Sequence, residues 1–253
     1  MKGTVYLVGA GPGAPDLLTL RAADLLARAG IVFHDALVNP EIVALAARAE
    51  KVPVGKRCGR HSAAQKFINK RLVDAARKHD VVVRLKGGDP MLFGRAQEEI
   101  DALSAAGVRC EVVPGVSSAL AASADLGISL TRRGISRSVS FVTPRVGDGE
   151  DPGNWVRAAL AADTTAIYMG AGEARSISAA LIAGGKPAAT PVVLIENASL
   201  PDTRWVTGKL MDLASMTEMG LGGPALILIG EVYREVASME STHHERIFAA
   251  KSG

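Results

Sequence analysis

The chain has 253 residues, which is enough for one large domain or two modest ones. Hydrophobic residues make up 48% of the sequence and charged residues 22%, and this composition excludes general disorder. The net charge of +3, from 29 basic and 26 acidic residues, is too balanced to predict a nucleic-acid-binding protein.

Short runs rich in Val, Ile and Leu alternate with Ala-rich stretches of helical period, and this alternation predicts an α/β fold with mostly parallel sheets. The predicted strands, in chain order, are Thr4–Val8, Gly30–Phe33, Val81–Leu85, Arg109–Val113, Ser138–Thr143, Thr165–Met169, Val192–Ile195 and Ala225–Ile229. The predicted helices are Pro15–Ala29, Pro40–Ala49, Ser62–Lys78, Met91–Ala106, Asn154–Ala162, Ala174–Ala183 and Met211–Met216.

A polar, arginine-rich stretch at 130–137 separates two runs of the α/β pattern. We therefore predict an N-terminal α/β domain at 1–115, a linker region at 116–137, a C-terminal α/β domain at 138–238 and a frayed tail at 239–253. His243 and His244 in the tail are without further ligands in the sequence pattern, and no metal site is predicted.

The only cysteines, Cys58 and Cys110, are far apart and do not have metal-ligand spacing. No apolar run approaches the ~20 residues of a membrane-spanning helix, and the chain opens directly into a strand-like segment. We expect a cytoplasmic protein with free thiols and with neither a membrane nor a nucleic acid as partner.

The glycine-rich segment VGAGPGAP follows the first predicted strand and has two interpretations. Gly9, Gly11 and Ala14, with Asp35 after the second strand, fit the pattern of a dinucleotide-binding fold and hence an NAD-dependent oxidoreductase. Pro12 removes an N–H from the loop, and Asp16 places a negative charge where a pyrophosphate would bind. Each disfavours that interpretation by roughly 1 kcal/mol.

Seven ordered segments carry a more specific resemblance. They are VGAGPGAPDLLTLRA at the start, HDALV at 34–38, VGKR at 54–57, RLKGGDPMLFGR at 84–95, VPGVSSA at 113–119, YMG at 168–170 and IEN at 195–197. Over residues 3–236 the chain resembles the tetrapyrrole methylases, and the segment at 84–95 resembles the uroporphyrinogen-III C-methyltransferases among them.

This resemblance implies a fold of two α/β domains with a cleft between them, and a homodimer. It implies methylation of uroporphyrinogen III at two ring carbons to give precorrin-2, for sirohaem or cobalamin synthesis. S-adenosylmethionine would be the methyl donor and S-adenosylhomocysteine the product. Asp35 would be a proton acceptor and Lys56 a proton donor. The implied cofactor site comprises Pro12, Gly87, Gly88, Asp89, Leu92, Ser117, Ser118, Met169 and Ala198.

The implied substrate carries eight carboxylates, which guanidinium groups bind in bidentate fashion. Arg132 and Arg145 stand where the resembled family commonly has histidine, so a proton-relay role of those histidines is not transferred here. A later-acting tetrapyrrole methylase, an NAD-dependent oxidoreductase and a non-catalytic binding module are the alternatives. The candidate substrate-binding residues are Arg57, Arg60, Arg84, Arg132, Arg133 and Arg137.

Overall fold

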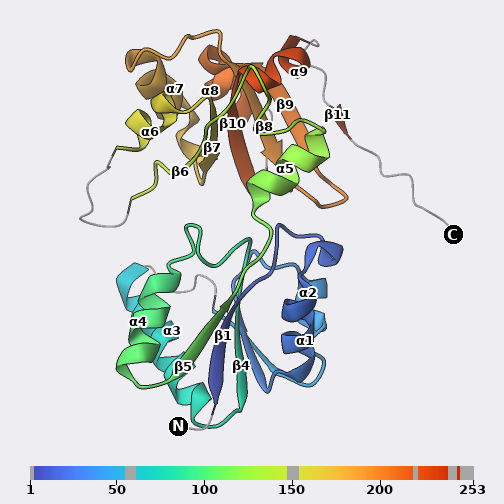
Figure 1. Ribbon diagram of the computed structural model, residues 1–253, viewed down its shortest axis with the longest axis vertical. Helices are drawn as coiled ribbons and strands as arrows, with labels where there is room; N and C mark the ends of the chain where they lie inside the picture. The colour runs from blue at the N-terminus through green and yellow to red at the C-terminus, as the bar shows by residue number, and fades with distance from the viewer. Residues whose placement is uncertain (1–2, 55–60, 147–153, 219–221, 239–243, 246–253) are drawn as a thin grey trace, which may run out of the picture. The chain divides into compact units, whose positions relative to one another are not determined.

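The computed structural model describes residues 3–54, 61–146, 154–218, 222–238 and 244–245, and it confirms the α/β fold class (Figure 1). The chain divides into two compact units, Met1–Ser118 and Ala119–Gly253. The stretch expected to be a linker, residues 116–137, contains helix α5 (Ser118–Leu126).

The first unit is built on five parallel strands in the order β3-β2-β4-β1-β5. The strands are β1 (Thr4–Gly9), β2 (Ile31–His34), β3 (Glu50–Pro53), β4 (Val81–Lys86) and β5 (Arg109–Val113). The edge strand β3 was not predicted, because its sequence EKVP buries only Val52 and has no apolar run.

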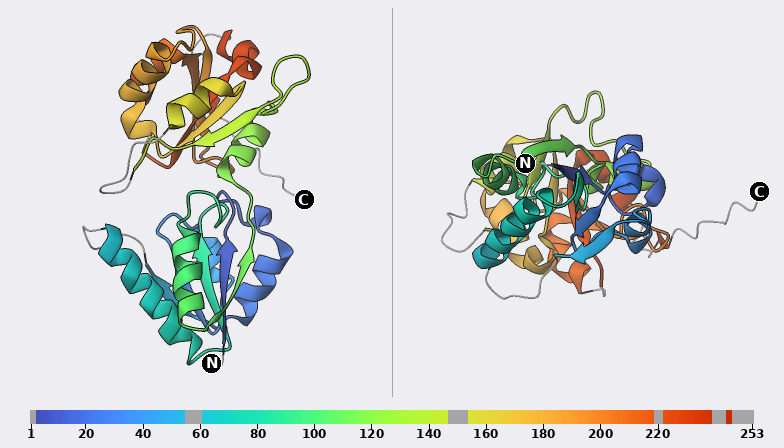
Figure 2. Two further views of the ribbon diagram at one scale, coloured as in Figure 1. Left: turned by 60° about the vertical axis from the view of Figure 1, so that its left-hand side comes forward. Right: turned by 90° about the horizontal axis from the view of Figure 1, so that it is seen from below.

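Four helices cover this sheet, two on each face (Figure 2). Helices α1 (Leu20–Arg28) and α2 (Pro40–Ala44) pack on one face, and α3 (His61–Ala76) and α4 (Ala96–Ala105) pack on the other. The two pairs lie on opposite faces because the chain reverses its direction across the sheet after β3, and parallel crossovers are right-handed.

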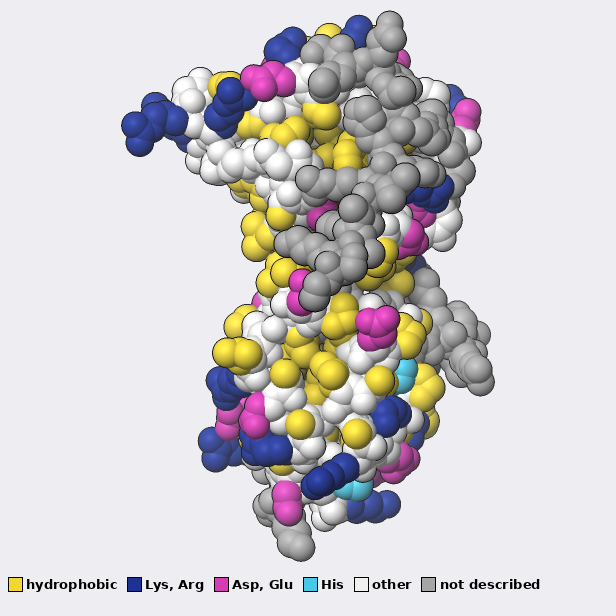
Figure 3. Space-filling view, turned by 90° about the vertical axis from the view of Figure 1, so that its right-hand side faces the viewer, with side chains coloured by type: hydrophobic (Ala, Val, Ile, Leu, Met, Phe, Trp, Pro, Cys, Tyr) yellow, Lys and Arg dark blue, Asp and Glu magenta, His cyan; other side chains and the backbone are white. Residues whose placement is uncertain are grey.

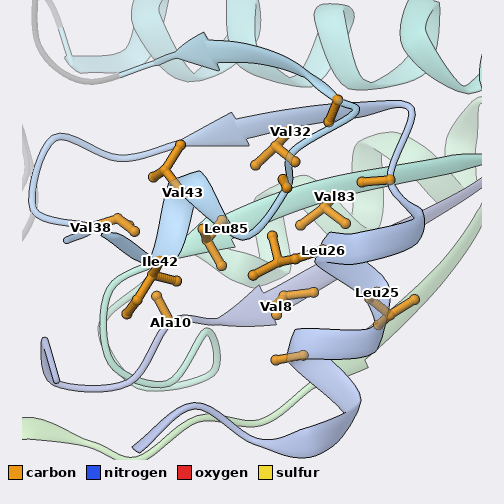
Figure 4. Packing of buried hydrophobic residues seen from close by; sticks show 14 of the residues in the cluster. Val8, Ala10, Leu25, Leu26, Val32, Val38, Ile42, Val43, Val83 and Leu85 are labelled. Carbon is orange, nitrogen blue, oxygen red and sulfur yellow. The ribbon is translucent and has the colours of Figure 1, made fainter. Parts of the chain in front are cut away.

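The α1/α2 face of the sheet is filled with aliphatic side chains. Val8, Val83 and Leu85 from the central strands meet Leu26 of α1 and Ile42 of α2, and all five are fully buried (Figure 4). A parallel sheet covered on both faces is a rigid support, so the loops at the carboxyl ends of its strands are held at fixed positions.

The first helix begins later than predicted. Pro15–Leu17 form a single 3-10 turn, and α1 starts at Leu20 after Thr19, whose side chain accepts a hydrogen bond from the backbone N–H of Ala22 at 3.2 Å. The glycine-rich loop therefore does not lead directly into a helix N-terminus, as a dinucleotide-binding fold requires.

The second unit contains a six-stranded sheet in the order β11-β9-β8-β10-β7-β6. Only β6 and β7 pair in parallel and the other four pairs are antiparallel, so the prediction of mostly parallel pairing is wrong for this sheet. Its strands are β6 (Val139–Val142), β7 (Thr164–Tyr168), β8 (Pro191–Glu196), β9 (Arg204–Lys209), β10 (Ala225–Gly230) and β11 (His244–Glu245).

The α-helices that follow α5 in the second unit are 5 to 10 residues long, and α7 is the longest of them. The short strand β11 pairs with β9, so part of the tail at 239–253 is ordered, whereas His243 lies outside the described residues. Among the described residues, no helix is long and apolar enough to cross a membrane, and no cluster of side chains fits a metal ion. The helices are α6 (Trp155–Ala161), α7 (Ala174–Ala183), α8 (Leu213–Thr217) and α9 (Arg234–Ser238).

Candidate active site

Four loops of the first unit follow the carboxyl ends of β1, β2, β4 and β5, and they lie at one edge of the sheet because all its strands are parallel. The chain connects β1 and β2 to helices on one face, whereas β4, which lies between them, leads to α4 on the other face. A crevice at the carboxyl ends of the strands is expected at such a reversal, and it is where sheets of this class bind ligands.

Three glycines allow these loops to pack against one another. A Cβ atom on Gly9 would lie 2.6 Å from the backbone of Gly115, and one on Gly115 would clash with the carbonyl oxygen of Gly88. Gly11 and Gly88 also exchange two backbone hydrogen bonds, of 3.2 and 2.7 Å. The loops after β1, β4 and β5 are therefore one backbone-packed assembly.

Asp89 joins the β4 loop to the β5 loop. One carboxylate oxygen accepts the N–H of Met91 at 2.8 Å, and the other accepts the N–H of Gly115 at 2.9 Å. Each oxygen keeps a free lone pair for a ligand, but the contacts seen here are structural. Asp89 therefore holds the shape of this loop.

Gly87 and Gly88 leave open space beside their backbone. A Cβ atom on Gly88 would meet nothing within 4 Å, and one on Gly87 would meet only the Cβ of Leu37, at 3.9 Å. Gly88 has a φ of +66°, a conformation that favours glycine. A ligand can therefore approach this loop closely, as a bound cofactor would need to do.

The other predicted cofactor residues of this unit also lie in these loops. Pro12 follows β1 and is half-buried, Leu92 is half-buried in the β4 loop, and Ser117 is buried after β5. Ser118 is the first residue of α5. These positions share one edge of the first sheet.

Asp35 is the first residue after β2, and its side chain is one-third exposed. Its backbone N–H donates to the carbonyl of Leu85 at 3.3 Å, and its Oδ1 accepts a hydrogen bond from Arg84 at 2.6 Å. Asp35 therefore reaches solvent at the carboxyl edge while it is anchored from within the sheet.

Arg84 does not fit the substrate-binding role suggested by the sequence. Its side chain is 3% exposed, and its guanidinium donates to Asp35, Glu99 and the carbonyl of Leu85. Burial by itself would lower the pKa of Arg84, but the carboxylates of Asp35 and Glu99 outweigh it and raise the pKa. The guanidinium stays charged, and each of its three nitrogens donates to an acceptor inside the protein.

Glu99 and Lys86 complete this buried group, and the sequence analysis did not identify them. Lys86 donates to Glu99 at 3.0 Å, and its pKa is lowered, chiefly by burial and then by the charge of Arg84. One signal was available: Arg84 and Lys86 lie two residues apart on an otherwise apolar strand, so they point to the same face of the sheet and need a buried anion there.

Met169 and Ala198 lie together at one edge of the second sheet. β7 and β8 are both antiparallel to β10, which lies between them, so they run in the same direction and end at the same edge. Met169 follows β7, has a φ of +56° and is 46% exposed, so it is not a core residue. Ala198 lies two residues after β8 and is buried.

Glu196, the last residue of β8, holds the neighbouring loop. Its carboxylate accepts backbone N–H bonds from Gly222, at 2.7 Å, and from Gly223, and it pairs with Arg204 at 2.6 Å. The side chain is 1% exposed, and burial alone would raise its pKa. The two amides and Arg204 outweigh burial, so the pKa of Glu196 is lowered.

This lowered pKa predicts a pH-dependent contribution to stability. Stabilisation by Glu196 should be complete above the unfolded-state pKa of about 4.3 and should be lost as the pH falls through the lower folded-state value. Glu196→Gln should reduce the free energy of unfolding by about 2 kcal/mol at pH 7, and by less at pH 3. Urea denaturation at both pH values tests this, with Glu218→Gln as a control on an exposed, 3.9 Å ion pair. An equal loss at both pH values would contradict it.

The predicted substrate-binding arginines of the second unit lie in and beside a tight turn. Arg132 and Ser136 pair across it with backbone bonds of 3.0 and 2.8 Å, and the loop projects from the unit (Figure 2). Arg132, Arg133 and Arg137 are exposed. Arg132 pairs with Glu235 at 3.0 Å, and the backbone N–H of Arg137 donates to Asp163.

Three residues with predicted roles lie outside the described residues, and the structure therefore does not test those roles. They are Lys56, Arg57 and Arg60. Arg145 follows β6 and is exposed. Because β6 is parallel to β7, Arg145 lies at the same edge of the second sheet as Met169.

Residues 4–214 match the family described as tetrapyrrole (corrin/porphyrin) methylases. The chain belongs to this family. The matched range includes the Gly87–Asp89 loop, Asp35 and the strand ends that carry Met169 and Ala198. The tetrapyrrole methylase fold is thereby confirmed.

Among known structures, the chain is similar to uroporphyrin III C-methyltransferase from Thermus thermophilus, with 40% identity, a TM-score of 0.81 and coverage of 94% of this chain and 97% of that one. A second structure of that enzyme, in complex with S-adenosylhomocysteine, gives 40% identity and a TM-score of 0.80 over 92% of this chain and 100% of that one. The cobalt precorrin-4 methyltransferase CbiF is 29% identical, with a TM-score of 0.80, over 90% and 95% of the two chains.

Among curated sequences, the chain is 46% identical to the siroheme synthase of Chromobacterium violaceum over 91% of its own length and 49% of the relative. It is 44% identical to the siroheme synthase of Psychrobacter sp., over 91% and 48% of the two chains. This member of the methylase family thus spans about half the length of the curated relatives that it matches.

Proposed function

We propose that this chain is an S-adenosylmethionine-dependent uroporphyrinogen III C-methyltransferase. It methylates two ring carbons to give precorrin-2 and S-adenosylhomocysteine, and its product feeds sirohaem or cobalamin synthesis. The 40% identity over nearly the full length of a solved uroporphyrin III C-methyltransferase supports this choice over a later corrin methylase, since the identity to CbiF is 29%.

One observation carries the proposal: the β4 loop is fixed by Asp89 yet leaves the backbone of Gly87 and Gly88 open. This loop lies at the chain reversal of the parallel sheet, where a ligand is expected. We assign the cofactor site to the loop, together with Pro12, Leu92, Ser117 and Ser118, and in the second unit to Met169 and Ala198.

When bound, S-adenosylmethionine supplies an electrophilic methyl group. A pyrrole carbon provides the electron pair of the new carbon–carbon bond, while the carbon–sulfur bond breaks and its electrons stay on sulfur. The methylated carbon skeleton must then lose a proton. Asp35 accepts this proton on its carboxylate, which is one-third exposed and is anchored by Arg84. Lys56 is the proposed proton donor; because each methyl transfer releases one proton in net, a proton that Lys56 gives to the tetrapyrrole is matched by a second deprotonation of the ring system. Such acid–base assistance contributes about 10²–10⁴-fold.

The eight substrate carboxylates require concentrated positive charge. Arg132, Arg133 and Arg137 supply it from the exposed turn of the second unit, with Arg57 and Arg60 as further partners. Arg132 already has one exposed partner, Glu235, and exposed ion pairs are weak enough to be exchanged for a substrate carboxylate.

A graded substitution at Gly87 tests the cofactor site. The Cβ atom of Gly87→Ala has space in the free protein, so this variant should melt within a few degrees of the unmodified chain. Gly87→Leu extends from the same open position, and its melting temperature is measured beside its affinity. If a ligand lies against this backbone, the affinity for S-adenosylhomocysteine should fall about threefold with alanine and more than about tenfold with leucine, because the side chain occupies the ligand's space. Calorimetric titration measures both. Unchanged affinity for the leucine variant would remove the Gly87 loop from the cofactor site.

We also propose a cytoplasmic homodimer. The side chain of Leu20, the first residue of α1, is 91% exposed, and that of Leu37, in the segment between β2 and α2, is 73% exposed. Apolar side chains are visible on the α1/α2 side of the first unit (Figure 3). Exposed apolar surface of this kind is typical of an interaction site. The free thiol of Cys110 is compatible with a reducing compartment. Light scattering should give twice the mass of one chain, and Leu20→Glu should shift it toward the mass of a single chain.

A further inference from the structure

The first unit buries three charged side chains between its sheet and the helices α3 and α4. Glu99 of α4 is fully buried, and Arg84 and Lys86 of β4 are each 3% exposed. Their neighbours on this face are aliphatic, for example Val82 and Leu103. Among the described residues, Glu99 is the only buried anion of this unit.

Burying charges is costly, and a set of apolar side chains of the same volume commonly packs at least as stably. The stability of the core therefore does not explain why a glutamate and two cations are buried here. The contacts of Glu99 indicate a different reason, because they lead outward to the surface.

Glu99 fixes Arg84, and Arg84 fixes Asp35. Glu99 Oε1 accepts from Arg84 Nε at 3.0 Å and from Gln65 at 3.1 Å, while its Oε2 accepts from Lys86 at 3.0 Å. Nη2 of the same guanidinium donates to Asp35 Oδ1 at 2.6 Å. All three nitrogens of this planar guanidinium donate to acceptors of the protein, so the guanidinium cannot turn and Asp35 has one preferred orientation.

We propose that Glu99 is a positioning residue, which orients the Asp35 carboxylate at the reaction site through Arg84. This proposal rests on the proposed role of Asp35 as the proton acceptor. Glu99 itself is fully buried and does not contact the substrate. Lys86 balances the charge of Glu99 through its own ion pair at 3.0 Å.

A double-mutant cycle separates positioning from general stabilisation. Glu99→Gln should lower kcat about tenfold, with KM for both substrates within twofold, because a misplaced catalytic group slows the reaction without weakening binding. In the presence of Asp35→Asn, the same change should lower kcat no further, because there is then no proton acceptor to position. Lys86→Met should leave kcat within about twofold.

Three outcomes decide the proposal. Non-additive losses support it, whereas losses that multiply show a merely structural role for Glu99 and overturn it. If Asp35→Asn alone leaves kcat unchanged, the proton-acceptor role of Asp35 fails, and the positioning role fails with it. If Glu99→Gln does not fold, the double variant Lys86→Met/Glu99→Gln replaces it in the same cycle, because this variant removes one positive and one negative charge together.

Discussion

Replacing Gly115 by alanine is expected to lower the free energy of unfolding by about 3 kcal/mol and to abolish binding of S-adenosylhomocysteine. The added methyl group would clash with the carbonyl oxygen of Gly88 and would lie 2.9 Å from the Cα of Gly9. Both neighbours are backbone, so no side chain can move aside. The three loops would have to separate, and the Gly11–Gly88 backbone pair would be disturbed with them.

Chemical denaturation and calorimetric titration of the same Gly115→Ala preparation measure the two effects. Gly172→Ala is the matched control, because its added methyl group would meet nothing within 4 Å. The control should stay within about 0.5 kcal/mol of the unmodified chain. A Gly115→Ala protein of unaltered stability and affinity would show that the loops are not packed as described.

The second large effect is expected for Asp35→Asn, which should lower kcat by about 10²-fold or more. The amide oxygen can still accept the hydrogen bond from Arg84, so the loop after β2 should keep its shape. The variant loses the capacity to take up a proton, and it also loses the negative charge that pairs with Arg84. Its affinity for S-adenosylhomocysteine should therefore stay within about threefold of the original.

Single-turnover methyl transfer and calorimetric titration test this pair of expectations. Asp35→Glu is the informative companion, because it keeps the carboxylate but lengthens the side chain, so part of the rate should return. A rate for Asp35→Asn close to that of the unmodified chain would exclude Asp35 as the proton acceptor.

The sequence patterns predicted the first unit better than the second. Strand β4 has the apolar run VVVRL, which is typical of a strand buried on both faces, whereas the second-sheet strand β9 is interrupted by Gly208 and was missed. Strand direction is set by how elements are connected in space. The β8–β9 pair is a local antiparallel connection, and apolar content does not reveal that.

The residue at which a helix begins was also hard to predict from the sequence. Helix α4 was predicted from Met91, but Phe93 and Arg95 have positive φ values, and the helix begins only at Ala96. Those backbone conformations belong to the loop that Asp89 ties to Gly115, 26 residues away. No local propensity carries information about such a distant partner.

Some residues of the candidate site could be predicted from the sequence, and others could not. The glycine loop and Asp35 could be proposed from the sequence because a motif carries each of them in a short segment. Glu99 was not, because its importance depends on side chains from β4, α3 and the loop after β2 meeting in the core. Likewise, Arg84 carries charge in the sequence but is enclosed in the structure, so charge alone suggested the wrong role.

The most direct test of the central proposal is anaerobic incubation of the purified chain with uroporphyrinogen III and methyl-labelled S-adenosylmethionine. Anaerobic conditions matter because the substrate oxidises readily. The proposal predicts two labelled methyl groups per tetrapyrrole and release of two molecules of S-adenosylhomocysteine. A chain that binds S-adenosylhomocysteine but leaves the tetrapyrrole unlabelled would contradict it.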